Sequence, residues 1–261
     1  MTDKILTRRD GAVAHVVFNN PGRHNAMSFE MWEATARAME DFANDDSVRV
    51  AVLSGAGGKA FVSGADISRF GDERASEDGI AKYNAMTERA YAAIHNFPKP
   101  TVAMIRGFCI GGGAAIAVCC DLRIATPASR FGIPAAKLGL GYEFDGVKRL
   151  VDLVGPSFAK EIFYTARQFD AEEARMMGLV NRVLPDAEIE QAVAALAATI
   201  AGNAPLTVAA IKMTVGEALK DPGARDLDKV AAAVKNCFAS RDYVEGRTAF
   251  LEKRKPAFTG K

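Results

Sequence analysis

The sequence has few of the residues that build metal centres and disulfide frameworks. It contains four cysteines and three histidines among 261 residues. The cysteines lie in or beside apolar stretches and show no CxxC spacing, which indicates buried thiols in a reducing compartment rather than disulfides. Three scattered histidines do not supply a histidine-rich metal site. We therefore expect a protein with neither a metal nor a redox cofactor.

The sequence also lacks an excess of either charge and lacks a long hydrophobic run. Lysine and arginine number 33 against 32 acidic residues, so we expect no binding to nucleic acid or to an anionic membrane surface. No apolar stretch reaches the 18 residues of a membrane helix, and the first residues, MTDKILTRRD, are too charged for a signal peptide. These absences favour a cytoplasmic protein. A small anionic ligand held by a few local cations remains compatible with this charge balance.

Apolar, β-branched runs alternate with helical patterns, which is typical of an α/β fold. The strand runs are largely apolar, so we expect both faces of the sheet to be covered. Ser28 precedes the first helical pattern and is its expected N-cap. The expected strands are 11–18, 48–55, 101–107 and 121–126, and the expected helices are 29–45, 80–96 and 112–120. After about residue 170 the patterns are mainly helical.

Three consecutive glycines open the helix expected at 112–120, in the stretch CIGGGAAIAVCCD (109–121). A strand, a glycine turn and a helix place free backbone N–H groups at the positive end of the helix dipole. Close packing of helix against strand explains the glycines equally well. A second turn of this kind, AFVSGADI (60–67), also follows a strand. Two such turns that each aim one N–H at a shared point would form an oxyanion hole.

These motifs, with others in a fixed order, resemble the crotonase superfamily of enoyl-CoA hydratases and isomerases. The motifs that carry the resemblance are NNPGRHNAM (19–27), AFVSGADI (60–67), KPTVAMIRGFCIGGGAAIAVCCDLRIAT (99–126), FGIPAAKLGL (131–140), DAEEARMMGLVNRVLP (170–185) and EGRTAFLEKRKPAF (245–258). The resemblance implies an α/β spiral of repeated ββα units over 1–200 and a helical oligomerisation region over 201–261. It also implies a homotrimer or a dimer of trimers, and a place in fatty acid metabolism.

The resemblance implies an acyl-CoA substrate, with coenzyme A present only as part of that substrate. The backbone N–H groups of Ala65 and Gly112 would bind the thioester carbonyl and stabilise the enolate formed from it. Preorganised donors of this kind favour the charge that grows in the transition state. The family's coenzyme A contacts would map onto Arg23, Ala26, Ala65, Ile67 and Gly112, and onto Phe250 and Lys253, the last two across a subunit boundary.

The sequence departs from the hydratase pattern at both glutamates that move protons in that family. Their positions match Ala115 and Ala135, and an alanine cannot transfer a proton. The loop 139–150 instead carries Tyr142, Glu143 and Asp145. Aromatic acyl-CoA dehalogenases resemble this loop in placing a working carboxylate at the position of Glu143. Methylmalonyl-CoA decarboxylases place a tyrosine at the position of Tyr142, but they carry a histidine where this chain has Ala65.

Each residue of the loop also has a structural interpretation. Asp145 would cap a helix beginning near Gly146, Glu143 would interact with the helix dipole or with Lys148, and Tyr142 would pack as a wall residue. In an apolar acyl pocket, by contrast, a single carboxylate would have a raised pKa, which suits a proton shuttle.

Four functions remain open, and the first is favoured. It is an isomerase-like proton shuttle that uses Glu143. The second is an enoyl-CoA hydratase with displaced carboxylates, Glu143 and Asp145. The third is decarboxylation of a malonyl-type thioester with Tyr142 as the positioning residue, although an acidic loop would repel the substrate carboxylate. The fourth is a catalytically silent protein that binds coenzyme A.

Overall fold

A computed structural model describes residues 2–69, 71 and 76–261. Its larger sheet has six strands in the order β1-β2-β3-β5-β7-β10. The first two strands pair antiparallel as a hairpin, and each later neighbour pairs parallel. These strands are β1 (Ile5–Asp10), β2 (Val13–Phe18), β3 (Val50–Gly55), β5 (Thr101–Ile105), β7 (Leu122–Ala125) and β10 (Arg182–Val183).

In a second, smaller sheet, three strands come directly after β3, β5 and β7 of the larger sheet, and a fourth follows α6 (Phe144–Thr165). Its order is β4 (Ala60–Val62), β6 (Phe108–Ile110), β8 (Arg130–Gly132) and β9 (Phe169–Asp170), with only β9 antiparallel to its neighbour. Gly107 makes the bend between β5 and β6. Its φ is +65°, and a Cβ there would lie 1.9 Å from the Lys59 carbonyl oxygen. Glycine is therefore required where the chain passes from one sheet to the other.

The central strand β3 is buried on both faces, as its apolar sequence predicts. Val50 and Val52 face one hydrophobic cluster, which α8 (Ile189–Gly202) covers. Ala51 and Leu53 face the other cluster, which holds the buried residues of α1 (Phe29–Ala43). Alternate residues of a strand point to opposite faces, so β3 separates two cores.

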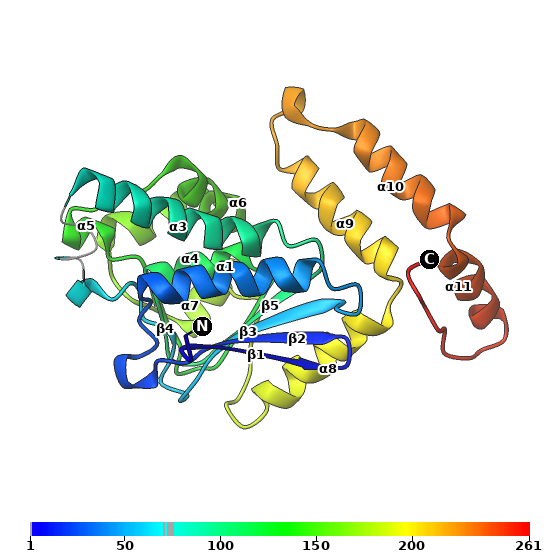
Figure 1. Ribbon diagram of the computed structural model, residues 1–261, viewed down its shortest axis with the longest axis horizontal. Helices are drawn as coiled ribbons and strands as arrows, with labels where there is room; N and C mark the ends of the chain where they lie inside the picture. Colours follow the sequence, from blue (N-terminus) through cyan, green and yellow to red (C-terminus); the bar gives the residue numbers. More distant parts are fainter. Residues whose placement is uncertain (1, 70, 72–75) are drawn as a thin grey trace.

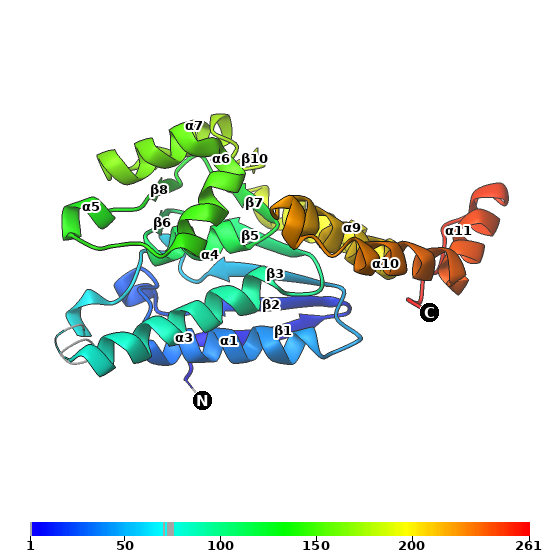
Figure 2. The same ribbon diagram turned by 90° about the horizontal axis from the view of Figure 1, so that it is seen from above.

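The helices of the core cover the two faces of the larger sheet, and Figures 1 and 2 show α1 and α3 lying side by side. The remaining helices of this part are α3 (Glu77–His95), α4 (Gly112–Cys119), α5 (Ala135–Leu138), α6 (Phe144–Thr165) and α7 (Ala171–Met176). Helix α6 is kinked at Gly155, where φ is 74° and ψ is 168°, immediately before Pro156. Short 3-10 turns lie at η1 (Pro21–Arg23), η2 (Ile67–Arg69) and η3 (Pro222–Ala224).

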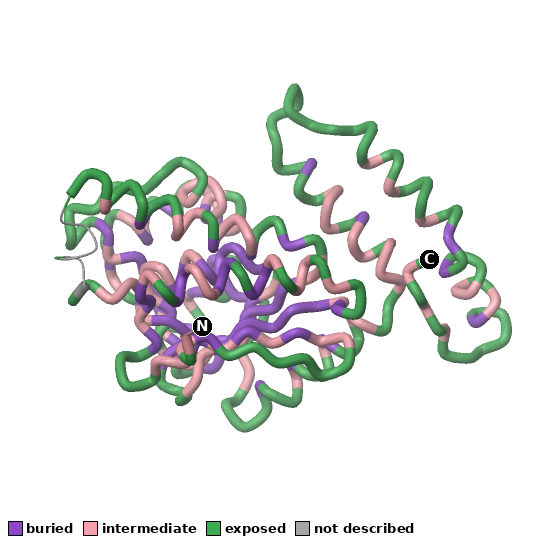
Figure 3. Tube along the Cα trace, viewed as in Figure 1, coloured by how far each residue is buried: buried purple, intermediate pink, exposed green. Residues whose placement is uncertain are grey.

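The last three helices extend away from the core, at the right of Figure 1. They are α9 (Pro205–Ala218), α10 (Leu227–Ala239) and α11 (Arg241–Leu251). Figure 3 shows that few of their residues are buried. Their exposed apolar side chains include Ile211, Val215, Leu227, Phe238, Phe250 and Leu251. An ion pair links α9 to the core, because the Lys212 Nζ lies 2.8 Å from the Asp121 carboxylate.

The expected α/β architecture is confirmed, with three differences in detail. The charged segment Ile5–Asp10, for which no strand was expected, forms the edge strand β1. The strand expected at 101–107 ends at Ile105 because Gly107 turns the chain into β6. The helix expected at 80–96 is α3, which begins earlier, at Glu77, and the polar segment before it lies partly outside the described residues. The division into 1–200 and 201–261 stays a prediction.

Within residues 2–69, 71 and 76–261, no single helix has the length and apolar composition to cross a membrane, and one bent pair, α8 with α9, meets those two criteria together.

Candidate active site

The two glycine turns predicted to form an oxyanion hole lie side by side. They follow β4 and β6, which pair parallel, so the turns leave the same end of the small sheet. A Cβ on Gly111 would lie 3.8 Å from the Gly64 Cα, and a Cβ on Gly64 would lie 3.4 Å from the Ile110 carbonyl oxygen. Both glycines have positive φ, +118° at Gly64 and +54° at Gly111. These distances are ordinary van der Waals contacts, so the positive φ values are the reason for glycine at both positions.

Each turn leaves one N–H without an acceptor among the described residues. Met27 donates to the Gly64 carbonyl at 2.8 Å, and Asp66 donates to the Met27 carbonyl at 2.8 Å. This pairing uses the groups on either side of Ala65 and leaves the Ala65 N–H unused. Gly112 is the first residue of α4, where an N–H has no partner within the helix. Two unused donors therefore come from adjacent turns, one of them at the positive end of a helix dipole.

Helix α4 is fixed at both ends. At its start, a Cβ on Gly113 would lie 2.0 Å from the Val62 carbonyl oxygen, so the helix packs directly on β4. Beyond its end, the Arg123 guanidinium donates to the carbonyls of Ala117 and Cys120 and to that of Leu179. Arg123 is 2% exposed, and burial lowers its pKa. Both contacts hold the position of the Gly112 N–H.

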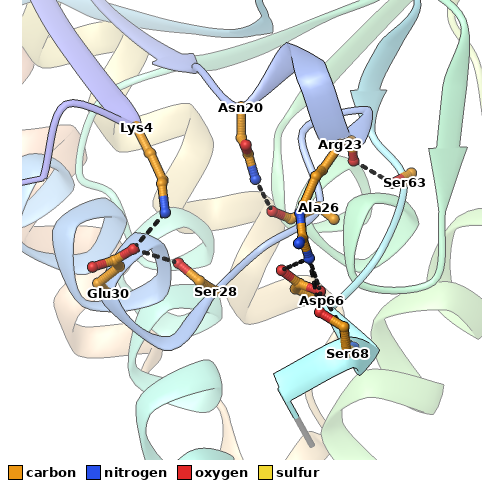
Figure 4. A network of polar contacts seen from close by, with 9 residues as sticks. All are labelled: Lys4, Asn20, Arg23, Ala26, Ser28, Glu30, Ser63, Asp66 and Ser68. Carbon is orange, nitrogen blue, oxygen red and sulfur yellow. Dashed lines mark hydrogen bonds and ion pairs between the residues drawn. The ribbon is translucent and has the colours of Figure 1, made fainter.

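Arg23, one of the predicted coenzyme A contacts, lies beside the Ala65 turn (Figure 4). Its Nη1 donates to both Asp66 carboxylate oxygens, at 3.0 and 3.1 Å, and to the Ser68 hydroxyl at 2.7 Å. Burial raises the pKa of Asp66, but the Ser68 hydrogen bonds and the Arg23 charge outweigh this effect and the pKa is lowered. Among the described residues these contacts use only Nη1, so Nε and Nη2 keep donors for a ligand.

The other predicted coenzyme A contacts fall into two groups. Ala26 and Ile67 flank Arg23 and Ala65; the Ala26 carbonyl accepts from Asn20, and the Ile67 side chain is open to solvent. Phe250, 83% exposed, and Lys253 lie in and just after α11. Figures 1 and 2 place α11 at the opposite end of the molecule from α5. One chain therefore does not bring Phe250 and Lys253 to the oxyanion turns.

The two alanines at the positions where the resemblance leads us to expect glutamates lie on the elements next to the turns. Ala115 is partly buried in α4, one helical turn after Gly111, and its N–H donates to the Gly111 carbonyl. Ala135 is the first residue of α5 and is buried. Neither side chain can accept or release a proton.

Two structural roles expected for the loop before α6 are not observed, the cap by Asp145 and the contact between Glu143 and Lys148. Helix α6 begins at Phe144, so Asp145 lies in its first turn and does not cap it; Glu143 is the N-cap residue but makes no side-chain cap hydrogen bond. Lys148 does not contact Glu143, because its Nζ is taken by Asp152 at 2.7 Å. Glu143 and Asp145 are both exposed in the single chain, not enclosed in an apolar pocket.

Tyr142 does pack as the structural interpretation expects. Its ring meets Phe163 edge to face, with centroids 5.0 Å apart, and desolvation raises the pKa of its hydroxyl. It also lies close enough to Tyr91 of α3 to contribute to a raised pKa there, after the larger effect of burial. The loop that carries Glu143 therefore lies near Tyr91, whose hydroxyl lies near Gly112.

Sequence reasoning missed a cluster of aromatic and polar residues behind Gly112. A Cβ on Gly112 would lie 3.1 Å from Trp32 and 3.5 Å from the Tyr91 hydroxyl. Close to Tyr91 lie the Cys119 thiol and the Glu88 carboxylate, and Glu88 pairs with Arg149 at 2.7 Å. The available signal was the spacing of Glu88 and Tyr91, three residues apart on one face of a helix.

A separate cavity of about 610 Å³ lies on another part of the surface. Its lining includes His24, Lys59, Phe108 and Arg130. None of the predicted site residues lines it, so we place the candidate site at the two N–H donors rather than at this cavity.

Comparison with known proteins identifies the family to which the chain belongs. A family model described as enoyl-CoA hydratase/isomerase matches residues 8–261. The chain is 35% identical to a crotonyl-CoA hydratase of Syntrophomonas wolfei over 99% of both chains, and 31% identical to a carnitinyl-CoA dehydratase of Escherichia coli over 100% of both. A solved structure of an enoyl-CoA hydratase/carnithine racemase from Magnetospirillum magneticum superposes with a TM-score of 0.93, at 36% identity, covering 100% of this chain and 97% of the other.

The chain belongs to the enoyl-CoA hydratase/isomerase family. It has the crotonase fold and is an enzyme of the lyase or isomerase class that this family contains.

Proposed function

We propose that the chain binds an acyl-CoA thioester and stabilises its enolate with the N–H groups of Ala65 and Gly112. The observation that carries this proposal is the pair of unused N–H donors on adjacent turns. Removing one such donor from an oxyanion hole typically slows a reaction by about 10²–10³-fold. Donors of this kind need no metal or redox cofactor.

We propose that Glu143 moves the proton, as in an isomerase. The residues at the usual proton-transfer positions are Ala115 and Ala135. The Glu143 carboxylate has no hydrogen bond or ion pair within the described part of the chain, so no structural role occupies it. The proximity of Tyr142 to Tyr91 supports placing this loop over the oxyanion turns.

Hydration is the second candidate, and the names of the relatives favour it. A crotonyl-CoA hydratase and a carnitinyl-CoA dehydratase are among them. With Ala115 and Ala135 in place, hydration needs two other carboxylates, and the loop offers Glu143 and Asp145. The two candidates differ in how many carboxylates they require.

We further propose that the complete site forms between subunits. Phe250 and Lys253 are exposed at the end of a helical extension far from their own chain's oxyanion turns. The exposed apolar residues of α9 to α11 favour burial against another copy. In a homotrimer or a dimer of trimers, Lys253 of one subunit would lie near Arg23 of the next. Sedimentation velocity measures the oligomeric state of the protein.

The reaction is tested by incubating the protein with crotonyl-CoA, a 3-enoyl-CoA and methylmalonyl-CoA in D₂O. Mass spectrometry follows the products and deuterium at the α-carbon. The isomerase-like proposal expects double-bond migration and exchange that fall at least about 10²-fold in Glu143→Gln, with Asp145→Asn nearly unaffected. Glu188→Gln is a matched control, because Glu188 is also an exposed N-cap glutamate without a side-chain cap bond.

Other results would select another function. Water addition that is lost in both Glu143→Gln and Asp145→Asn identifies a hydratase. Loss of CO₂ from methylmalonyl-CoA that survives Glu143→Gln identifies a decarboxylase. Thioesters that bind but never change identify a silent binding protein and refute the proposal.

A further inference from the structure

Tyr91 places a hydroxyl beside one of the two oxyanion donors. The residue lies in α3, and its ring meets the Trp32 ring edge to face with centroids 5.2 Å apart. Its hydroxyl lies 3.5 Å from the position that a Cβ on Gly112 would take. The rigid indole fixes the direction of the phenol, so the hydroxyl points to the Gly112 turn.

The Tyr91 hydroxyl has no hydrogen-bond partner among the described residues, and the residue is partly buried against the core. The neighbouring Tyr83 hydroxyl, by contrast, accepts a hydrogen bond from Trp32 Nε1 at 3.0 Å. A buried hydroxyl without a partner is unfavourable. Burial raises the pKa of Tyr91 well above 10, so the group remains a neutral O–H donor throughout the physiological range.

The protein supplies no acceptor on the side where the acyl group would lie. A glutamate in place of Ala115 would bring a carboxylate to this face of α4, but alanine leaves it apolar. One turn later on the same face, the Cys119 thiol is neutral, because burial raises its pKa to about 12. A ligand in this space can supply the acceptor that the described residues do not give Tyr91.

The charges around Tyr91 select the kind of acceptor. The titratable groups that face it are Tyr142, Cys119, Tyr83 and Glu88. The Glu88 carboxylate is paired with the Arg149 guanidinium at 2.7 Å, and the Arg149 side chain is 14% exposed. This pair has no net charge, so no unpaired cation is left to attract a carboxylate. The cluster favours a neutral oxygen.

We propose that the Tyr91 hydroxyl contacts the substrate and donates a hydrogen bond to a neutral oxygen on the acyl group, such as a 3-hydroxyl, next to the thioester carbonyl held by Gly112. This inference rests on the acyl-CoA function proposed above. It makes Tyr91 a specificity-determining residue that favours acyl groups with such an oxygen over plain alkyl chains.

The test uses Trp32, the protein's only tryptophan, whose fluorescence reports on ligands at this site. Butyryl-CoA and 3-hydroxybutyryl-CoA are titrated into the wild type, into Tyr91→Phe and into Tyr164→Phe, whose tyrosine is exposed in the second half of α6. We expect 3-hydroxybutyryl-CoA to bind the wild type about tenfold more tightly than butyryl-CoA. Tyr91→Phe should abolish that preference while changing butyryl-CoA affinity less than about twofold, and Tyr164→Phe should change neither affinity.

The titrations distinguish a failure of the Tyr91 inference from a failure of the acyl-CoA function on which it rests. Equal affinity of the wild type for both thioesters overturns the role of Tyr91 and leaves the acyl-CoA function intact. A tenfold preference that persists in Tyr91→Phe does the same. If neither thioester binds the wild type, both the acyl-CoA function and the inference fail. Butyryl-CoA binding in Tyr91→Phe also shows that the variant site is folded.

Discussion

Replacement of Arg123 by methionine should destabilise the protein through the far end of α4. The buried guanidinium donates to Leu179 through Nε at 2.6 Å, to Ala117 through Nη1 at 3.1 Å, and to the carbonyls of Cys120 and Asp121. No carboxylate pairs with it among the described residues. Methionine has a similar length but no donor, so Arg123→Met keeps much of the volume and removes every one of these bonds.

The size of the effect follows from those contacts. A hydrogen bond from a charged donor is worth about 1.5–3 kcal/mol, so the two bonds to Leu179 and Ala117 are worth about 3–6 kcal/mol together. Methionine recovers part of this sum because no charge has to be buried. We expect the free energy of unfolding to fall by about 2–4 kcal/mol, a large part of the total for an average domain.

Urea unfolding followed by Trp32 fluorescence and by circular dichroism measures this change. Arg123→Lys, which keeps the charge but not the planar fork of donors, should lose less than Arg123→Met. Arg182→Met is the matched control, because Arg182 is exposed on the neighbouring strand β10. An Arg123→Met protein within about 0.5 kcal/mol of the wild type would show that the guanidinium does not hold the end of α4.

Two further predictions concern the start of α4 and the C-terminal helices. Gly113→Ala should lower the free energy of unfolding by about 3 kcal/mol or more, because its Cβ would lie 2.0 Å from the Val62 carbonyl oxygen, whereas Gly223→Ala, with no atom within 4 Å, should change the melting temperature little. Hydrogen bonds from Arg254 and from the Ala257 N–H lower the pKa of Glu245 from 4.5 to about 2. The hydrogen bonds that Glu245 accepts should hold the residues after α11 in place fully above pH 4.5, and they should be lost as the pH falls through 2. The loss would appear as weaker protection of the Ala257 amide, measured as its exchange rate relative to the intrinsic rate at the same pH. In Glu245→Gln this protection should not change with pH.

The sequence was sufficient to predict what depends on local pattern. The strand β3 was predicted from its apolar run, and the turn before Gly112 was predicted from glycines whose φ values only glycine adopts easily. Edge strand β1 was not predicted, because only Ile5 of its six residues is buried and its polar side chains face water. An edge strand in contact with water carries a weak hydrophobic signal.

The part of the site that was missed depends on contacts between distant segments. Trp32 and Tyr91 are far apart in the sequence and meet only because α1 packs on α3. No spacing rule connects a tryptophan on one helix with a tyrosine hydroxyl on another. The prediction that Asp145 caps α6 was wrong because the helix begins at Phe144, two residues before Gly146. Sequence patterns locate the ends of helices only to within one or two residues.

Strand β3 divides the interior into two compartments with different consequences for engineering. The compartment under α8, built on Val50, Val52 and Val102, contains no residue of the candidate site. The other compartment includes Trp32 and Ala114, which adjoin the glycine turn at the start of α4. Stabilising substitutions often reduce activity when they stiffen a working site. Under α8, thermal tolerance can be raised by repacking without altering any residue of the candidate site.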